Sequence, residues 1–275
     1  MYENSRRSGC SGRLIIAAII AVISIFSYYR TSSVNPVTGE KQHIGITPDQ
    51  EIALGLQAAP QMEAQYGGED PDPQRSGLVK EVGQEVVSQS SAGQTPYRYD
   101  FHLLADDKTI NAFALPGGQV FITDALLSKL KTRGQLAGVL GHEVGHVVAR
   151  HSAEHMAKAQ LTQGLTGAAV IATYDPNDSR SYRNAAFAMM IGQMINLKFS
   201  RNDELEADKL GLRLMAQAGY DPRSMASLMK ILEEAGGARS VEFFSTHPNP
   251  ENREKLIEQE IKDMYPNGVP SGLKE

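Results

Sequence analysis

The sequence contains little cysteine and no excess of positive charge. Its 275 residues include one cysteine, Cys10, which excludes a disulfide framework and zinc modules built from several cysteines. Lys and Arg number 27 against 32 Asp and Glu, so the formal net charge is −5. We expect no nucleic-acid partner, because proteins that bind phosphate backbones carry a basic patch or stripe. The sequence also has no internal repeat and no low-complexity tract, and its composition is that of a globular protein.

One apolar run is present, and it lies close to the N-terminus. Residues 14–26 read LIIAAIIAVISIF, with Ser24 as the only polar residue, and three arginines precede the run. This is the layout of a secretory signal or a signal anchor. The run is shorter than the roughly 17–25 residues that cross a bilayer, but two tyrosines extend it at the membrane interface. No small-x-small cleavage site follows, so we favour an uncleaved anchor over a removed signal, with the N-terminus in the cytoplasm.

Capping signals and hydrophobic periodicity predict an α+β domain that is mostly helical with a small sheet. Thr47-Pro48-Asp49-Gln50 carries a capping box and a proline at the first helical position, so a helix should run to about Tyr66. Further helices are expected over 74–90, 134–160, 164–174, 183–199, 201–217 and 223–235, and strands over 97–105, 110–115 and 120–123.

The chemistry is concentrated in two of these helices. Residues 142–146 read HEVGH. At about 100° per residue, His142 and His146 lie on one helical face, where two imidazoles can bind one Zn²⁺. Glu143 lies on the adjoining edge, where a carboxylate can take the proton of a water that the metal activates. The alternative interpretation is a pair of surface histidines with no metal.

A catalytic zinc usually takes a third protein ligand, and a second helix offers one. Residues 202–208 read NDELEAD, in which Glu204 and Asp208 share a helical face while Glu206 points nearly the opposite way. Glu204 is the candidate ligand. Asp208 can accept the second N–H of a ligating histidine and so fix its tautomer. Taken alone, this pattern also fits an acidic, solvated helix face.

The other histidines are expected to be solvated or structural. His151 and His155 fall within the expected helix 134–160, but each lies nine residues beyond one of the two motif histidines, which rotates it about 180° away. We expect both to be solvent-exposed. His43, in a polar linker, and His102, in a strand, are expected to be structural.

Three segments together resemble one protein family. HEVGHVVARHSAEH (142–155), SRNDELEADKLG (200–211) and STHPNPENR (245–253) are similar to the signature blocks of the HtpX/BepA-type zinc metallopeptidases. These gluzincins also include the CAAX prenyl proteases. NPVTGEKQ (35–42) and NAFALPGG (111–118) resemble the exported and mitochondrial inner-membrane members. The resemblance implies one Zn²⁺ per chain, held by the two motif histidines.

The resemblance also implies roles for individual residues outside that motif. It makes Glu204 rather than Glu206 the third zinc ligand and Asp208 the partner of a zinc histidine. His247 matches a histidine that, in some relatives, approaches the metal and holds the enzyme latent. Arg253 matches an arginine thought to stabilise the transition-state oxyanion. From the residues alone, His247 could equally belong to a turn, and Arg253 could equally form an ordinary salt bridge.

The expected strand 110–115 resembles the sheet edge on which such proteases lay an extended substrate. An ordinary hairpin is an equally consistent interpretation. The membrane segments differ from those of HtpX and the prenyl proteases, because 164–174 and 183–199 are too short or too polar to cross a bilayer. The chain also ends before the helical-repeat module of the BepA-type members. The expected domains are a signal anchor or transmembrane segment (1–30), a linker (31–46), a zinc metallopeptidase domain (47–265) and a tail (266–275).

The sequence thus predicts a zinc metalloendopeptidase anchored in a bacterial inner membrane, with its catalytic domain on the periplasmic side. The resemblance implies unfolded or misassembled envelope proteins as substrates. Two alternatives stay open: a latent protease acting mainly as an envelope chaperone or assembly factor, and an envelope scaffold with a structural metal or none. The intact Glu143 argues against the scaffold, because a structural zinc site needs no base beside it.

Overall fold

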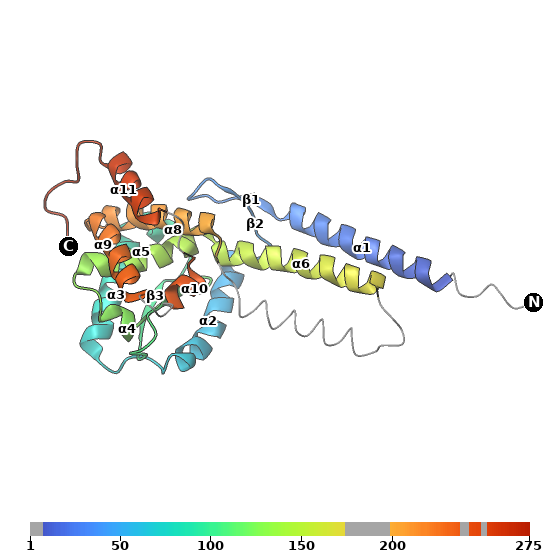
Figure 1. Ribbon diagram of the computed structural model, residues 1–275, viewed down its shortest axis with the longest axis horizontal. Coiled ribbons are helices and arrows are strands. Elements are labelled where there is room, and N and C mark those ends of the chain that lie inside the picture. The colour runs from blue at the N-terminus through green and yellow to red at the C-terminus, as the bar shows by residue number, and fades with distance from the viewer. Residues whose placement is uncertain (1–7, 174–198, 237–241, 249–251) are drawn as a thin grey trace, which may run out of the picture. The chain divides into compact units, whose positions relative to one another are not determined.

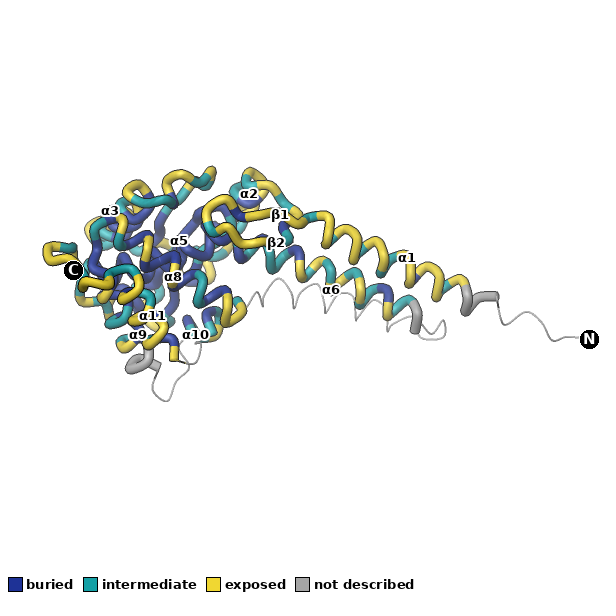
Figure 2. The backbone as a smooth tube through the Cα atoms, turned by 90° about the horizontal axis from the view of Figure 1, so that it is seen from above, coloured by how far each residue is buried: buried dark blue, intermediate teal, exposed yellow. Residues whose placement is uncertain are grey.

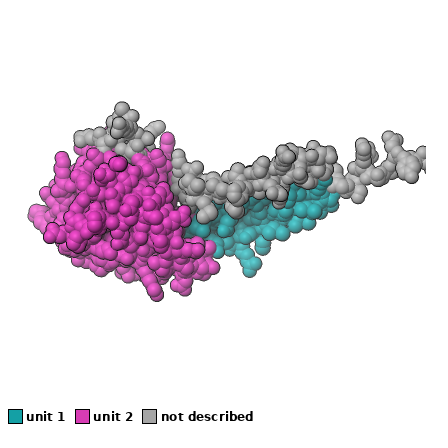
Figure 3. All heavy atoms as spheres, turned by 90° about the horizontal axis from the view of Figure 1, so that it is seen from below, with its two compact units in different colours: residues 1–45, 153–197 teal, residues 46–152, 198–275 magenta. Residues whose placement is uncertain are grey.

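A computed structural model describes residues 8–173, 199–236, 242–248 and 252–275 of the chain. It divides into two compact units, shown in different colours in Figure 3. The first unit comprises residues 1–45 and 153–197, and the second comprises residues 46–152 and 198–275. Most described residues are helical, the sheets are small and an apolar helix lies near the N-terminus, so the predicted α+β class is confirmed. The domain boundaries expected from the sequence stay a prediction.

The first unit contains the apolar helix α1 (Ser8–Arg30). Its segment Gly12–Arg30 is long and apolar enough to cross a membrane. Most large apolar side chains of α1 are exposed, which Figure 2 shows as a predominantly yellow helix. The helix therefore continues beyond the predicted apolar run, through the two tyrosines that we expected to extend it.

A hairpin follows where the sequence suggested an irregular linker. Strands β1 (Ser32–Val34) and β2 (Lys41–His43) pair in an antiparallel register. The ring of His43 stacks on that of Tyr28, with centroids 4.3 Å apart, and its Nδ1 lies 3.0 Å from the Tyr28 carbonyl oxygen. These contacts join the hairpin to the end of α1 and give His43 a structural place, as expected.

Helix α6 (His151–Thr173) belongs to the first unit from residue 153 onward. It approaches α1 closely, because a Cβ atom built on Gly164 would lie 2.0 Å from Ser24 Oγ. The expected helix 164–174 is therefore the end of a longer helix. Almost all of the expected helix 183–199 lies outside the described residues.

The second unit packs its helices around a three-stranded sheet (Figure 1). The sheet has the order β3-β5-β4, with β3 (Asp100–Leu104) parallel to β5 (Gln119–Thr123) and β4 (Ala112–Ala114) antiparallel to it. Among the described strands, β4 therefore forms an edge. The other elements of the unit are α2 (Pro48–Gln65), α3 (Pro73–Ser88), the 3₁₀ helix η1 (Ser91–Gln94), α4 (Asp124–Leu127), α5 (Arg133–Ala149), α8 (Arg201–Gln217), α9 (Arg223–Gly236), α10 (Glu242–Thr246) and α11 (Arg253–Met264).

Local signals in the sequence explain several of these elements. Thr47 caps α2 through the predicted box: its hydroxyl accepts a hydrogen bond from the Gln50 amide, and the Gln50 side chain accepts one from the Thr47 amide. Gly117 and Gly118 adopt φ angles of 82° and 112° between β4 and β5, a conformation that favours glycine. The expected helices 201–217 and 223–235 are confirmed as α8 and α9.

The expectation of one continuous helix over 134–160 is wrong. Helix α5 ends at Ala149, Arg150 takes a left-handed conformation with φ of 61°, and α6 begins at His151. This conformation is unfavourable for a residue with a Cβ atom. It is stabilised here because Arg150 Nε donates to Glu51 Oε1 at 2.8 Å and its Nη2 donates to the Ile46 carbonyl at 3.0 Å.

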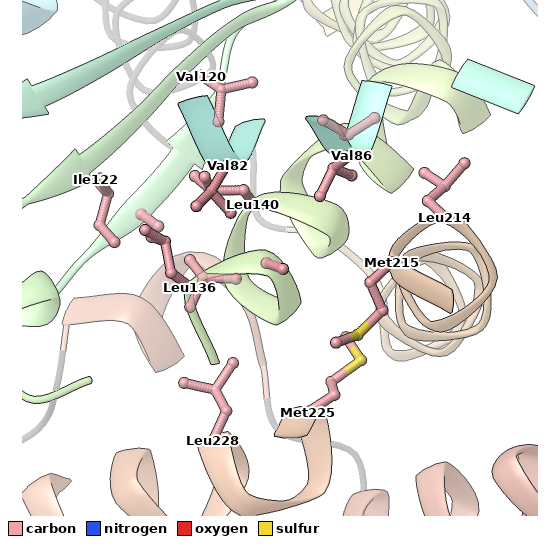
Figure 4. Packing of buried hydrophobic residues seen from close by; sticks show 14 of the residues in the cluster. Val82, Val86, Val120, Ile122, Leu136, Leu140, Leu214, Met215, Met225 and Leu228 are labelled. Atoms are coloured by element: carbon pink, nitrogen blue, oxygen red, sulfur yellow. The ribbon is translucent and has the colours of Figure 1, made fainter. Parts of the chain in front are cut away.

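The core of the second unit forms where α3 and α5 pack on the sheet and where α8 and α9 pack on α5. Figure 4 shows apolar side chains from all of these elements pointing toward one another. The labelled residues are Val82, Val86, Val120, Ile122, Leu136, Leu140, Leu214, Met215, Met225 and Leu228. Helix α5 lies at the centre of this core, and nearly all of its residues are buried (Figure 2).

Glycines let α5 and α8 touch through their backbones. A Cβ atom built on Gly145 would lie 2.8 Å from the Ala207 carbonyl oxygen, and one built on Gly211 would lie 2.9 Å from the His142 amide nitrogen. Both distances are shorter than a Cβ atom tolerates. The two helices that carry the predicted ligands therefore cross at a distance that larger residues would not allow.

We predict that Gly145→Ala and Gly211→Ala each lower the free energy of unfolding by about 1–3 kcal/mol, because a methyl group overpacks this crossing. Urea unfolding of the full-length protein in detergent measures the change. Gly77→Ala in α3 is the matched control, since a Cβ atom there meets nothing within 4 Å. It should leave stability unchanged or raise it by about 0.5–1 kcal/mol. Wild-type stability in both crossing variants would contradict this packing.

Candidate metal centre

The structure brings together the three ligands predicted from the sequence. His142 and His146 project from α5, and their Nε2 atoms lie 3.1 Å apart. The Ser200–Asp203 capping box begins α8 and places Glu204 in its first turn. Glu204 Oε1 lies 3.4 Å from His146 Nε2, and its Oε2 lies 3.5 Å from His142 Nε2. All three side chains are almost completely buried.

His247 lies in the same cluster. Its Nδ1 is 3.0 Å from Glu204 Oε1 and 3.4 Å from His142 Nε2, while its Nε2 is 3.6 Å from Glu143 Oε1. It follows α10 and stacks on Phe243, with ring centroids 4.6 Å apart. Its side chain is fully buried, so it is not a residue of a surface turn. Its ligand atom lies within 4.8 Å of those of the three predicted ligands.

This set of donors fits a divalent cation. Within the described part of the chain, both carboxylate oxygens of Glu143, Glu204 Oε2 and His247 Nε2 are buried without a hydrogen-bond partner. Burying such groups without a partner is costly. Two imidazoles and one carboxylate around a common point form a ligand set that catalytic zinc takes. A cation at that point would supply the interaction that Glu204 Oε2 lacks.

Burial and hydrogen bonding set the protonation of the cluster without a metal. Burial raises the pKa of Glu143 and lowers that of His146. Burial lowers the pKa of His142, but hydrogen bonds with Asp208 and Glu204 have the larger effect and raise this pKa to about 9. Burial raises the pKa of Glu204, but hydrogen bonds from His142 and His146 have the larger effect and lower this pKa. The site therefore keeps Glu204 ionised.

Asp208 and Arg253 form a buried ion pair behind His142. Asp208 Oδ1 lies 2.9 Å from His142 Nδ1. Arg253 Nε and Nη2 donate to the two Asp208 oxygens, both at 2.7 Å, and Nη2 also lies 3.3 Å from Glu204 Oε2. Burial opposes ionisation of Asp208, but the charge of Arg253 outweighs it and lowers the carboxyl pKa. Arg253 thus makes a salt bridge, which was one of the two roles expected from the sequence, and it also lies beside the group of candidate metal ligands.

The expectation that His151 is solvent-exposed is wrong. Its side chain is 1% exposed, and its Nδ1 lies 2.8 Å from His146 Nδ1. Its Nε2 lies 3.4 Å from Oε2 of Glu206, the carboxylate that the sequence excluded as a ligand. The 180° separation assumed an unbroken helix, whereas the break at Arg150 redirects the chain. No glycine, the usual signal for a helix end, marks that break in the sequence.

Two other histidines complete the comparison with the sequence. His155, one turn further along α6, is partly buried and lies outside the metal group. His102 is buried in β3, where its Nδ1 lies 2.9 Å from Glu69 Oε1 and its Nε2 lies 3.0 Å from Gln119 Oε1. Its ring stacks on Phe121. Both ring nitrogens are thus engaged within the fold, as expected for a structural histidine.

Comparison with known proteins adds independent information. The model of "Peptidase family M48" matches residues 73–261. The chain is 31% identical over 249 residues to the mitochondrial metalloendopeptidase OMA1 of Schizosaccharomyces pombe, covering 89% of this chain and 71% of that protein. It is 29% identical over 271 residues to the beta-barrel assembly-enhancing protease of Escherichia coli, covering 94% of this chain and 54% of that protein. The chain therefore spans about half the length of the Escherichia coli relative.

We predict that Arg253→Met lowers the free energy of unfolding by about 3–5 kcal/mol, because it leaves the Asp208 anion buried without its counter-charge. Adding Asp208→Asn should restore part of this loss, since the double variant buries neither charge. Urea unfolding in the presence of a chelator measures both changes. A double variant less stable than either single variant would argue against a coupled pair.

The same pair predicts a pH dependence. The folded-state pKa of Asp208 is depressed, so its stabilisation is present above the unfolded-state pKa of about 3.9 and is lost as the pH falls through the folded-state value. Unfolding free energies measured between pH 3 and pH 6 should therefore fall more steeply on acidification in the wild type than in the double variant. Equal slopes would contradict the assignment.

Proposed function

We propose, since the chain belongs to peptidase family M48, that it is a zinc-dependent metalloendopeptidase that hydrolyses peptide bonds. The family that the three sequence segments resembled is confirmed by the match over residues 73–261. The observation that carries the proposal is the position of Glu143, whose unpartnered carboxylate lies beside a buried group of two histidines and a glutamate. A general base next to a metal-ligand set suits hydrolysis and has no purpose in a structural site.

In this mechanism His142, His146 and Glu204 would hold one zinc ion. When bound, zinc supplies Lewis acidity that polarises the scissile carbonyl and lowers the pKa of water. Glu143 takes the proton of the attacking water and delivers it to the leaving amine. Burial raises the pKa of Glu143 and so brings the carboxylate closer to the basicity this transfer needs at neutral pH.

Asp208 and Arg253 act beside these groups. Asp208 accepts the Nδ1–H of His142, which keeps the lone pair of His142 Nε2 directed at the cluster. Arg253 is held on Asp208 through Nε and Nη2, while its buried Nη1 has no hydrogen-bond partner among the described residues. We assign to this guanidinium the stabilisation of negative charge that develops on the scissile carbonyl oxygen.

An extended substrate fits the edge of the sheet. Strand β4 lies at that edge, and a shallow recess beside it is lined by Ala114, Leu115 and Pro116 and by His146 of α5. Main-chain pairing with β4 would bind an unfolded segment with little sequence preference. Unfolded or misassembled envelope proteins are the proposed substrates, in keeping with the name of the Escherichia coli relative. The apolar helix α1 supports a membrane anchor. We place this anchor in a bacterial inner membrane, with the catalytic domain on the periplasmic side, because arginines precede the apolar run.

A latent protease that acts mainly as a chaperone or assembly factor is the second candidate function. The position of His247 favours it, because its imidazole lies between Glu204 and Glu143. A fourth ligand there would take the coordination position that catalytic zinc leaves for water. Proteolysis would then require His247 to move out of the cluster.

We predict that Glu143→Gln abolishes proteolysis but keeps the metal, because the amide cannot accept a proton and Glu143 is not a ligand. The rate of casein cleavage should fall roughly a hundred- to ten-thousand-fold. Zinc content should stay at one ion per chain in both proteins. Glu242→Gln on α10, outside the metal group, is the control and should cleave like the wild type.

Equal cleavage of casein by wild type and Glu143→Gln would exclude this mechanism. Zinc binding without cleavage in either protein would favour the latent or chaperone function. Absence of zinc from the purified wild type, after its reconstitution with the metal, would exclude the ligand assignment.

We predict that His247→Ala raises casein cleavage above the wild-type rate, since it vacates the position beside Glu143. The double variant His247→Ala/Glu143→Gln should be inactive, which ties the gain to the same site. If His247→Ala instead lowers cleavage while zinc content and unfolding midpoint are unchanged, His247 assists the reaction and does not impose latency.

A further inference from the structure

The two histidines of the predicted metal centre have different partners on the outer side of their rings. Behind His142 stands the carboxylate of Asp208, neutralised by Arg253. Behind His146 stands a third imidazole, that of His151, with the two Nδ1 atoms 2.8 Å apart. This separation is within the range of a short N–H···N hydrogen bond. The two ligands are therefore oriented by chemically different groups.

The direction of this hydrogen bond follows from the chemistry of the rings. The Nε2 of His146 faces the cluster, and a nitrogen that binds a metal offers its lone pair, so the proton of a neutral His146 resides on Nδ1. His146 Nδ1 then donates, and His151 Nδ1 accepts. An accepting Nδ1 places the proton of a neutral His151 on Nε2, which faces Glu206 Oε2 at 3.4 Å, at the long end of a hydrogen bond.

The fold holds His151 in this position from several sides. Its side chain is 1% exposed, so the bulk solvent does not compete for its Nδ1. Directly before it stands Arg150, whose left-handed conformation is stabilised by Glu51 and by the Ile46 carbonyl. Phe199 stacks on the ring of His146, with centroids 4.0 Å apart. The contact between the two histidines is thus a built feature of the second unit.

We propose that His151, supported by Glu206, is the positioning residue for the metal ligand His146. It accepts the Nδ1–H of His146, which fixes the tautomer and the ring orientation that direct Nε2 to the metal. This inference rests on the proposed metal function of the cluster. The proposal gives His151 of α6 and Glu206 of α8 a role in the site, although neither residue belongs to the HEVGH motif or to the candidate ligands.

The proposal can be tested because asparagine and glutamine replace different halves of an imidazole. In His151→Asn, the amide oxygen lies as many bonds from Cβ as Nδ1 does, so it can accept from His146. In His151→Gln, the amide lies at the distance of Nε2, so it reaches toward Glu206 and offers His146 no acceptor. His151→Ala removes both functions. His155→Asn, one turn further along α6, controls for a change of the same kind outside the contact.

The experiment measures zinc affinity in the full-length protein in detergent, by competition with a chromophoric chelator at pH 7. We expect His151→Ala and His151→Gln to bind zinc about 10–100-fold more weakly, the usual effect of losing a hydrogen-bond partner behind a metal ligand. His151→Asn and His155→Asn should stay close to the wild type. The unfolding midpoint of each metal-free protein separates this effect from a general loss of structure.

Several outcomes would overturn the proposal. One is wild-type affinity in His151→Ala and His151→Gln. Another is an equal loss of affinity in His151→Asn and His151→Gln, since a positioning role requires the Asn variant to recover. A loss of affinity that follows the metal-free unfolding midpoint across all variants would show that His151 acts only through stability.

Glu206 gives a second variant that does not depend on a buried position, because its side chain is 28% exposed. Glu206→Gln retains an acceptor for His151 Nε2–H and should bind zinc like the wild type. Glu206→Ala should bind it more weakly than Glu206→Gln, and equal affinity in these two proteins would exclude its supporting role. A wild-type protein that binds no zinc defeats the proposed function itself, whereas normal binding in every variant defeats only the role of His151.

Discussion

The backbone contact between α5 and α8 is the constraint on which the rest of the second unit depends. Glycine in a helix interior costs about 0.5–1 kcal/mol relative to alanine, yet Gly141, Gly145 and Gly211 all stand at this crossing. Their absent side chains let the two helices approach until His142 and Glu204 come within 3.5 Å. A wider crossing would leave the imidazoles and the carboxylate too far apart to share one ion. The glycines at this crossing thus lower the helix propensity of α5 and α8 but allow the close approach that groups the candidate ligands.

Bringing these groups together creates a problem of buried charge. Glu143, Glu204 and Asp208 are three carboxylates with almost no exposure, close to one another in the core. Arg253, from α11 near the C-terminus, compensates Asp208, and its Nη2 lies 3.3 Å from Glu204 Oε2. The other oxygen, Glu204 Oε1, lies 3.4 Å from His146 Nε2. The C-terminal helix therefore belongs to the electrostatics of the site and does not merely cover it.

The candidate ligands were predictable because the helical face that each occupies depends on short-range geometry within its own helix. Helical periodicity is sufficient to place His142 and His146 on one face and Glu204 on a face of its own helix, and the structure brings the three together. The α+β class followed from the same local patterns. The ordered hairpin at 31–46 was not predictable, because β1 and β2 are three residues each and their pairing carries no apolar alternation. The position of His151 was mispredicted for a different reason.

That reason is the break at Arg150, whose cause lies about a hundred residues earlier in the chain. Glu51, in the first turn of α2, and the Ile46 carbonyl hold the guanidinium and with it the left-handed backbone. The residues next to Arg150 in the sequence carry no sign of these distant contacts, so a prediction from helical periodicity extends α5 beyond its actual end. An unbroken helix would turn His151 about 140° away from His146 and about 180° away from His142. The salt bridge between α2 and the residue that follows α5 is therefore a condition for the contact between His146 and His151, and it links the start of the second unit to the geometry of the candidate metal centre.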